Sequence, residues 1–324
     1  MNAPPPATVL VTGGCGYLGS LAVAALADRV QRVVAFDVRA PQQPHPAVTY
    51  EIGDIRSSDL RELLRRHEVE AVVHLAAVVS PPRDMDVRTL HDIEVGGAAR
   101  LLEACVSAGV RHVTVASSGA AYGYHETNRG RWLTEEDPVR GSERFAYSRH
   151  KAEVEELLAA YRRSHPEFAQ LVLRPGTILG EHTSNQITDL FEKPVILDLW
   201  GVDVPFVFVW DRDVAEIIAH GVSESIAGIF NVAGDGIVTL ADIARIEGVR
   251  RLPLPPSLLS GALAVLHRLR LTQYGPEQVD FLRYRPVLAN DRLKQVFPGL
   301  PSRTSREVYE IYRGGRSARE AHRG

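Results

Sequence analysis

Cysteine is nearly absent from this chain of 324 residues, which has only Cys15 and Cys105. Two cysteines cannot build a disulfide framework, and such sparing use fits the reducing cytoplasm, where we expect the protein to reside. No spacing of cysteine and histidine suggests a zinc site, so we expect no metal. A large excess of charge of one sign is also missing, because the chain has 37 Lys and Arg and 40 Asp and Glu. This balance gives no electrostatic reason to expect nucleic acid as a partner.

Long apolar runs are lacking as well. The N-terminus, MNAPPPATVLV, has no charged start followed by an apolar stretch, so we predict no signal peptide. The longest apolar segment, Leu252–Leu271, is interrupted by prolines and carries His267, Arg268 and Arg270 near its end. It is too short and too broken to span a bilayer. We expect a lobe helix that packs its leucines inward; a helix that lies on a membrane surface or caps a pocket is the alternative.

The first half of the chain alternates short β-branched runs with longer helical patterns. The runs that read as strands are 8–12, 32–38, 47–54, 70–77 and 111–118. The helical patterns between them are Leu18–Arg29, Ser57–His67 and Asp92–Ala108. Most of the strands are apolar throughout, as expected where both faces of a sheet are buried. We therefore predict an α/β fold with a doubly wound parallel Rossmann sheet.

The second half is less regular. A long helix is expected over 144–164, a strand over 168–175, a strand and helix over 205–222, and a further strand near 228–236. After about residue 250 the rhythm of strands and helices fades. We predict a cofactor-binding domain from 1–175 plus 206–249. A smaller, mixed C-terminal substrate lobe would comprise 176–205 plus 250–315, and 316–324 would form a flexible tail.

The stretch VLVTGGCGYLGSLAVAAL, Val9–Leu26, places glycines between a strand and a helix. Gly13 permits a tight turn, Gly16 lets the backbone approach a pyrophosphate, and Gly19 lets helix and strand pack closely. The helix N-terminus would then hold the negative charge. The alternative is a plain turn without a ligand.

Two carboxylates at strand ends support the cofactor interpretation. Asp37 follows Gly19 by 18 residues, where a carboxylate can accept hydrogen bonds from the adenosine ribose. It would repel a 2′-phosphate, so we predict NAD rather than NADP, although Arg39 could soften the preference. Asp54 could reach the adenine amino group, with Ile55 against the ring; a turn-forming aspartate is the alternative.

Tyr147 and Lys151 are four residues apart and share one face of the expected helix. A nearby ammonium favours the phenolate, so such a tyrosine can remove a substrate hydroxyl proton while hydride leaves the same carbon. Ser117 and Ser118 end the strand upstream, where a hydroxyl can hydrogen-bond the reacting oxygen.

Together these motifs resemble the extended short-chain dehydrogenases/reductases, also described as NAD-dependent epimerases/dehydratases. TGGCGYLG, DVR, GDIR, HLAA, ASSGAAYG, YSRHK, LRPG and FNVAGDG occur in that family's order over Val9–Gly236. The resemblance implies that Ser118, rather than Ser117, is the catalytic serine, with Tyr147 as acid/base and Lys151 as its partner. The residues expected to bind the cofactor are Gly13, Gly16, Tyr17, Leu18, Gly19, Asp37, Asp54, Ile55, Leu75, Ala76, Ala77, Tyr147, Lys151 and Pro175.

Several positions depart from the family pattern. Glu94 stands where the family often has a structural asparagine, and Thr177 stands where nucleotide-sugar enzymes usually have asparagine. The arginine expected before the strand PFVFVW is missing, and Arg212 is a possible replacement for holding a diphosphate. Ser80, Thr177 and Arg212 are therefore the candidate substrate contacts.

Other side chains receive structural interpretations. We expect His150 on the outer side of the catalytic helix. Trp132, Trp200 and Trp210 are expected to pack in the core or the lobe.

The predicted activity is that of an NAD-dependent oxidoreductase, with a sugar-nucleotide 4-epimerase acting through a transient ketone as the first interpretation. A dehydrogenase or reductase of another secondary alcohol is the second, and a catalytically silent NAD-binding regulatory protein is the third. By the family resemblance, the helices 92–108 and 144–164 could pair with their copies in a homodimer.

Overall fold

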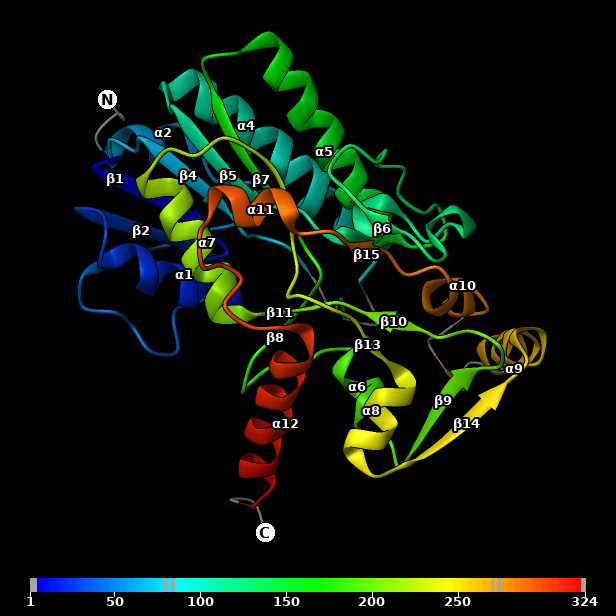
Figure 1. The fold of residues 1–324 in the computed structure, drawn as a ribbon. Coiled ribbons are helices and arrows are strands. Elements are labelled where there is room, and N and C mark those ends of the chain that lie inside the picture. The colour runs from blue at the N-terminus through cyan, green and yellow to red at the C-terminus, as the bar shows by residue number, and fades with distance from the viewer. Residues whose placement is uncertain (1–4, 79–80, 83–84, 270, 273–274, 322–324) are drawn as a thin grey trace.

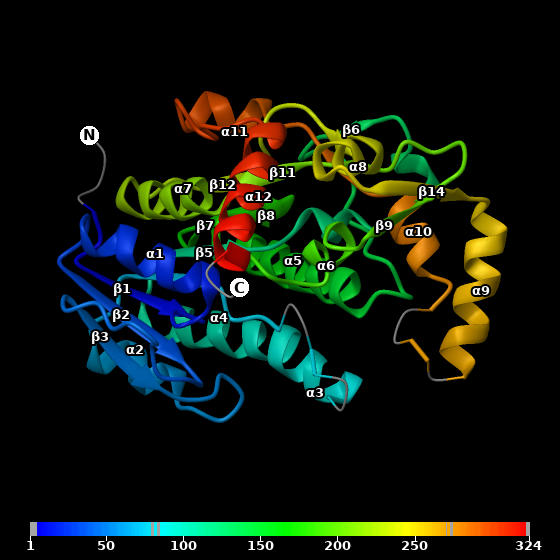
Figure 2. The same cartoon turned by 90° about the horizontal axis from the view of Figure 1, so that it is seen from below.

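The computed structural model describes residues 5–78, 81–82, 85–269, 271–272 and 275–321. Its centre is a parallel sheet of seven strands in the order β12-β7-β5-β4-β1-β2-β3 (Figures 1 and 2). The strands are β1 (Thr8–Thr12), β2 (Arg32–Asp37), β3 (Val48–Ile52), β4 (Ala71–His74), β5 (His112–Ala116), β7 (Ala169–Pro175) and β12 (Gly228–Val232). The predicted α/β class with a doubly wound parallel sheet is confirmed.

Helices cover both faces of this sheet, as the two views in Figures 1 and 2 show. One face carries α1 (Tyr17–Ala27), α7 (Asp211–Ser223) and α11 (Asp291–Val296), and the other carries α2 (Leu60–Arg66), α4 (Gly97–Ala108) and α5 (Ala146–Ser164). Val9 and Val11 belong to the core beneath the first set, whereas Leu10 belongs to the core beneath the second. Successive side chains of a strand point to opposite faces, which is why β1 is apolar throughout.

The helix expected over Asp92–Ala108 is interrupted in the structure. It consists of α3 (Val87–His91), a π-helical turn η1 (Asp92–Gly96) and α4. Glu94 lies in the π-helical turn and is 5% exposed. Such turns are rare and often lie at functional sites, and no pattern in the sequence distinguished this one from a regular helix.

The remaining elements form a lobe at the carboxyl edge of the sheet. Its short strands pair as β8 (Thr177–Leu179) with β11 (Phe208–Trp210), β9 (Val195–Leu199) with β14 (Arg250–Leu254), β10 (Pro205–Phe206) with β13 (Val238–Thr239), and β6 (Trp132–Leu133) with β15 (Val287–Leu288). Its helices are α6 (Thr188–Phe191), α8 (Leu240–Glu247), α9 (Pro256–Arg268), α10 (Gln278–Arg283) and α12 (Ser305–Ala321), with 3-10 turns at Gly119–Tyr122 and Glu126–Asn128. A separate apolar core joins most of these elements, with Phe206, Leu240 and Tyr309 among its members, while β6 and β15 pack in a smaller cluster with Tyr122.

The packing differs from the expected boundaries in three places. Val238 to Glu247 packs into the lobe core, although 206–249 was expected with the cofactor domain. Leu293 and Phe297 join the core of the large sheet, although 250–315 was expected in the lobe. The expected tail at 316–324 instead continues α12 as far as Ala321. Packing contacts across the chain decide these boundaries, and composition alone could not locate them.

The expectation that the leucines of 252–271 pack inward holds only for Leu254, Leu259 and Leu263, which pack against the lobe core, and is wrong for the others, which are exposed. Leu259 is the one buried residue of α9, and most of the helix faces solvent. Trp132 and Trp200 are also exposed rather than packed, while Trp210 packs against the lobe core. Among the described helices, none combines the length and the apolar character that crossing a membrane requires.

Candidate functional site

The glycine turn lies between β1 and α1 at the carboxyl edge of the sheet. Gly13 has a φ of +71°, a conformation that favours glycine, and a Cβ there would fall 2.7 Å from the backbone nitrogen of Ala76. A Cβ on Gly19 would fall 2.0 Å from the carbonyl oxygen of Gly13. Both glycines are therefore required by close backbone contacts, as the sequence pattern predicted.

Gly16 precedes the first residue of α1 and provides no side-chain cap. The first N–H groups of a helix have no partner within it, so this end of α1 suits an anion. The side chain of Tyr17 reaches α7 instead of the glycine turn. Its hydroxyl donates to the Asp211 carboxylate and lies 3.0 Å from Thr183 Oγ1. Leu18 packs against the core of the sheet.

Asp37 lies at the end of β2, directly beside the glycine turn. Its carboxylate accepts hydrogen bonds from the backbone nitrogens of Cys15, at 3.1 Å, and Arg39, at 3.2 Å. Leu75, Ala76 and Ala77 follow β4 on the other side of the turn, where the Leu75 nitrogen donates to Thr12. The open helix end, the close-packed glycines and the adjacent carboxylate fit a dinucleotide such as NAD.

Asp54 and Ile55 are already engaged within the protein. The Arg56 guanidinium bonds the Asp54 carboxylate at 2.6 Å and holds its pKa below the usual range. Ile55 is 5% exposed and packs against Gly97 of α4. Pro175 ends β7 near Gly119, and a Cβ on this glycine would lie 3.4 Å from the Pro175 carbonyl oxygen.

The structure brings Ser118, Tyr147 and Lys151 together. Burial raises the pKa of Tyr147 to about 12, and a hydrogen bond from the Ser118 side chain opposes this rise. Lys151 Nζ lies 5.6 Å from the Tyr147 ring centre and donates to the Ala116 carbonyl at 2.8 Å. Burial lowers the pKa of Lys151, so the ammonium is held close to the tyrosine at some cost in solvation.

The two adjacent serines have different surroundings. Ser117 Oγ donates to Glu155 at 2.6 Å, and the same carboxylate forms a buried ion pair with Arg174. Arg174 also donates to the Tyr122 hydroxyl at 2.8 Å. Ser117 therefore belongs to a buried polar network beneath the site, whereas Ser118 faces Tyr147.

His150 does not lie on the outer side of α5, so that prediction is wrong. Its side chain is fully buried, and its Nδ1 lies 2.7 Å from Glu94 Oε2. The other oxygen of Glu94 accepts from the Val78 nitrogen at 3.3 Å. The π-helical turn that carries Glu94 packs on this side of α5 and supplies a buried partner that the sequence pattern did not reveal.

Arg285 is a further candidate site residue, which no sequence pattern singled out. Its guanidinium lies 4.2 Å from the ring centre of Phe206 and 4.5 Å from that of Phe281, and Nη2 donates to Thr177 Oγ1 at 3.2 Å. Burial lowers the pKa of Arg285 to about 10. Nη1 is buried and has no hydrogen-bond partner, and no carboxylate pairs with Arg285 among the residues that the structure describes.

Tyr124 interacts with both this arginine and Tyr147, the predicted acid/base. Its ring contacts Phe145 and Phe281, each at 5.0 Å between ring centres. Burial raises the pKa of Tyr124 to about 12; the charge of Arg285 opposes this rise, whereas Tyr147 adds to it. An aromatic wall therefore extends from Tyr147, the predicted acid/base, to a buried cation without a carboxylate partner among the described residues, and only the tertiary fold brings its members together.

The other substrate candidates lie in different settings. Thr177 contacts Arg285, whereas Arg212 is exposed, stacks on Trp210 and forms a long ion pair of 4.0 Å with Glu181. Ser80 lies outside the described residues.

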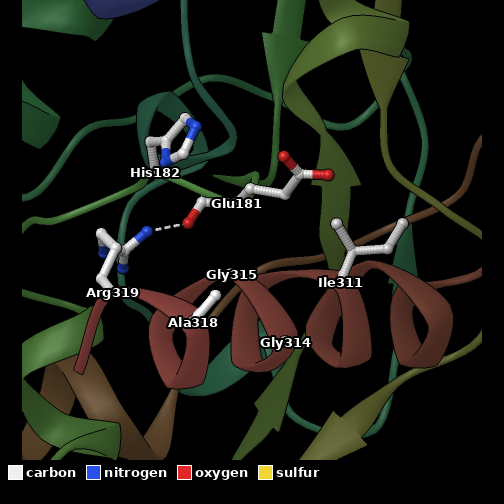
Figure 3. Close-up of a pocket in the computed structure, with 7 residues that line it drawn as sticks. All are labelled: Glu181, His182, Ile311, Gly314, Gly315, Ala318 and Arg319. Carbon is white, nitrogen blue, oxygen red and sulfur yellow. Dashed lines mark hydrogen bonds between the residues drawn. The ribbon is translucent and has the colours of Figure 1, made fainter. Parts of the chain in front are cut away.

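A cavity of about 690 Å³ lies between α12 and the loop after β8, as Figure 3 shows. Glu181 and His182 line one side, and Gly314, Gly315 and Ala318 line the other. A Cβ on Gly315 would fall 2.3 Å from the Glu181 carbonyl oxygen, so the helix packs closely on this loop. None of the site residues predicted from the sequence is among the described residues that line this cavity.

Comparison with known proteins gives a consistent result. A family model described as the NAD dependent epimerase/dehydratase family matches residues 9–233. An uncharacterised protein of Mycobacterium tuberculosis is 28% identical over 320 residues, which cover 96% of this chain and 84% of that protein. A UDP-glucose 4-epimerase of Erwinia amylovora is 31% identical over 202 residues, which cover 56% of this chain and 56% of the epimerase.

Solved structures resemble this fold over different lengths. A short-chain dehydrogenase/reductase superfamily protein from Agrobacterium tumefaciens with bound NAD has a TM-score of 0.74 at 21% identity, covering 98% of this chain and 99% of the other. MoeE5 in complex with UDP-glucuronic acid and NAD has a TM-score of 0.63 at 25% identity, covering 76% of this chain and 85% of MoeE5.

Proposed function

The chain belongs to the NAD-dependent epimerase/dehydratase family, and on that premise we propose that it is a 4-epimerase of a nucleotide sugar. The predicted resemblance to extended short-chain dehydrogenases/reductases and the prediction of an NAD-dependent enzyme are confirmed. The nucleotide-sugar substrate, a homodimeric state and a cytoplasmic location are parts of the same proposal.

Arg285 is the observation that carries the substrate proposal. A buried guanidinium without a carboxylate partner is costly, and an anionic ligand would supply the missing charge. Planar guanidinium groups bind phosphate oxygens well, and Thr177 adds a hydroxyl beside it. The aromatic wall at Tyr124 and Phe281 lies between this cation and Tyr147, so a substrate with a diphosphate at one end and a secondary alcohol at the other fits the arrangement.

The glycine turn, Asp37 and Lys151 would hold NAD, which supplies the two-electron acceptor that oxidation of the alcohol requires. Tyr147 Oη accepts the proton of the substrate hydroxyl and returns it when the ketone is reduced. Ser118 hydrogen-bonds the reacting oxygen, and the Lys151 ammonium favours the phenolate of Tyr147. In an epimerase the ketone stays in the site and is reduced on its opposite face.

The named relatives support the same substrate class. The Erwinia protein is a UDP-glucose 4-epimerase, and MoeE5 was solved with UDP-glucuronic acid. The match spans about half the length of that epimerase.

A dehydrogenase or reductase of a less polar alcohol is the second proposal. The aromatic residues Tyr124, Phe145 and Phe281 favour it, since they offer apolar surface to a substrate. In that case the ketone leaves the site after one half-reaction, and reduced cofactor accumulates.

The test is to incubate the purified protein and NAD with UDP- and dTDP-hexoses and, in parallel, with apolar secondary alcohols. Inverted configuration at C4, without net absorbance at 340 nm, supports the epimerase. Accumulating absorbance at 340 nm supports the dehydrogenase instead. NAD binding without turnover of any substrate would point to the silent regulatory protein.

The matched variants are Tyr147→Phe and Tyr161→Phe, both on α5. Tyr147→Phe should abolish turnover and leave NAD binding largely intact, because it removes only the hydroxyl that transfers the proton. Tyr161→Phe should retain turnover. Full activity of Tyr147→Phe would refute the proposed mechanism.

A further inference from the structure

The end of the lobe farthest from the large sheet exposes an unusual amount of apolar surface. Leu258, Val265 and Leu269 are 58%, 59% and 61% exposed, and Trp200 is 70% exposed. In both views α9 stands at the outer end of the molecule beside β9 and β14 (Figures 1 and 2). We define the end patch as the outer stripe of α9, the outer face of the β9–β14 pair, and Trp200.

The apolar residues of α9 are arranged in one stripe. Leu258, Ala262, Val265 and Leu269 are spaced by four, three and four residues, which places them on one side of the helix. All four are exposed, while Leu259 and Leu263 pack against the lobe core on the adjacent side of the helix. The helix therefore has two neighbouring apolar stripes, of which one packs on the lobe and the other faces solvent.

The strands of the end patch repeat this arrangement. Leu197 and Leu252 are paired in register, so their side chains share one face of the two-stranded sheet, and each is 47% exposed. Ile196 points to the other face, where it is buried. Trp200 follows β9, and its backbone nitrogen donates to the Leu254 carbonyl at 2.9 Å, immediately before α9 begins.

Charge indicates what covers this surface. No Asp or Glu occurs in the sequence from 248 to 276, whereas four arginines do. Arg251 pairs with Asp198, but Arg250 and Arg268 form no ion pair with any described carboxylate, and both are exposed. A second copy of the chain would bring like charges together, while an anionic surface would complement them.

We propose that the end patch binds the surface of an anionic lipid bilayer, with α9 lying in the interface. Exposed leucines and valine would enter the boundary between headgroups and acyl chains. An indole ring at the edge of an apolar surface suits the headgroup region, and arginines attract anionic lipids. The inference goes beyond the proposed reaction and does not depend on its substrate.

The experiment is sedimentation of the full chain with phosphatidylcholine vesicles that contain or lack phosphatidylglycerol. The protein should bind the anionic vesicles and bind them more weakly at high salt. Val265→Glu combined with Leu269→Glu should weaken binding more than tenfold. Arg250→Gln and Arg268→Gln should each weaken binding to the anionic vesicles about fivefold.

Val87→Glu is the matched control, because Val87 is apolar and 60% exposed on α3, outside the end patch. It should bind like the unaltered protein, and circular dichroism should show every variant folded. Unchanged binding by the Val265→Glu, Leu269→Glu variant would overturn the proposal. Absence of vesicle binding, with light scattering showing a dimer that this variant dissociates, would assign the patch to a second copy instead.

Discussion

Glu94 and His150 form a buried pair, with Oε2 and Nδ1 2.7 Å apart, next to the helix face that carries Tyr147 and Lys151. The negative charge of Glu94 raises the pKa of both Tyr147 and Lys151. We therefore propose that Glu94 is a positioning residue, whose charge acts on Tyr147 and Lys151, the proposed acid/base and its partner.

Glu94→Gln should move both limbs of the pH–activity profile to lower pH. Removing the negative charge lowers the pKa of Tyr147, so the phenolate forms at lower pH, and it lowers the pKa of Lys151 as well. The measurement is kcat against pH beside Glu103→Gln, an exposed carboxylate on α4 that should leave the profile unchanged. An unshifted profile for Glu94→Gln would contradict this role. Glu94→Ala should also destabilise the fold by about 3 kcal/mol, because it leaves His150 buried without its partner.

Arg285→Met should raise KM for the anionic substrate by about tenfold or more, and leave NAD affinity unchanged. It should also stabilise the free protein by about 1 kcal/mol, because it removes a buried cation that has no carboxylate partner. Substrate titration and urea unfolding measure the two effects. Arg292→Gln, which affects an exposed arginine paired with Glu136, is the control and should change neither KM nor NAD affinity. Unchanged KM in Arg285→Met would remove the argument for an anionic substrate.

Asp37→Asn should weaken NAD binding about tenfold and narrow the preference for NAD over NADP. The carboxylate lies beside the glycine turn, and its negative charge both strengthens hydrogen bonds to ribose hydroxyls and repels a 2′-phosphate. Fluorescence titration with both cofactors tests this, with Asp28→Asn at the far end of α1 as control. Equal losses of affinity for NAD and for NADP would show that Asp37 does not select between the two cofactors.

Acid should destabilise the protein through His74. Burial lowers the pKa of His74 to about 3, whereas the unfolded side chain has a pKa near 6.5. The unfolded chain therefore binds a proton first as the pH falls, and stability is lost progressively between pH 6.5 and 3, by a few kcal/mol. His74→Gln should reduce this dependence of the unfolding free energy on pH, measured by urea unfolding at several pH values. If the variant lost stability with falling pH as steeply as the unaltered protein, groups other than His74 would cause the loss.

Sequence patterns determined the features that depend on local geometry. Apolar runs of strand length predicted the sheet, because strands buried on both faces of a sheet are apolar throughout, and apolar residues at helical spacing predicted its flanking helices. Gly13 and Gly19 were recognisable because only glycine fits where backbones approach within van der Waals distance. Tyr147 and Lys151 share a helix face by spacing alone.

Tertiary structure decided the contacts between segments distant in the chain. Arg285 approaches Thr177 across 108 residues, and Glu94 meets His150 across 56, so no local pattern could pair them. Which side of α9 faces solvent could also not be read from the sequence, because the same leucines can face a core or water. Local spacing fixes which side chains share a face, but only the packing of the whole chain decides what that face meets.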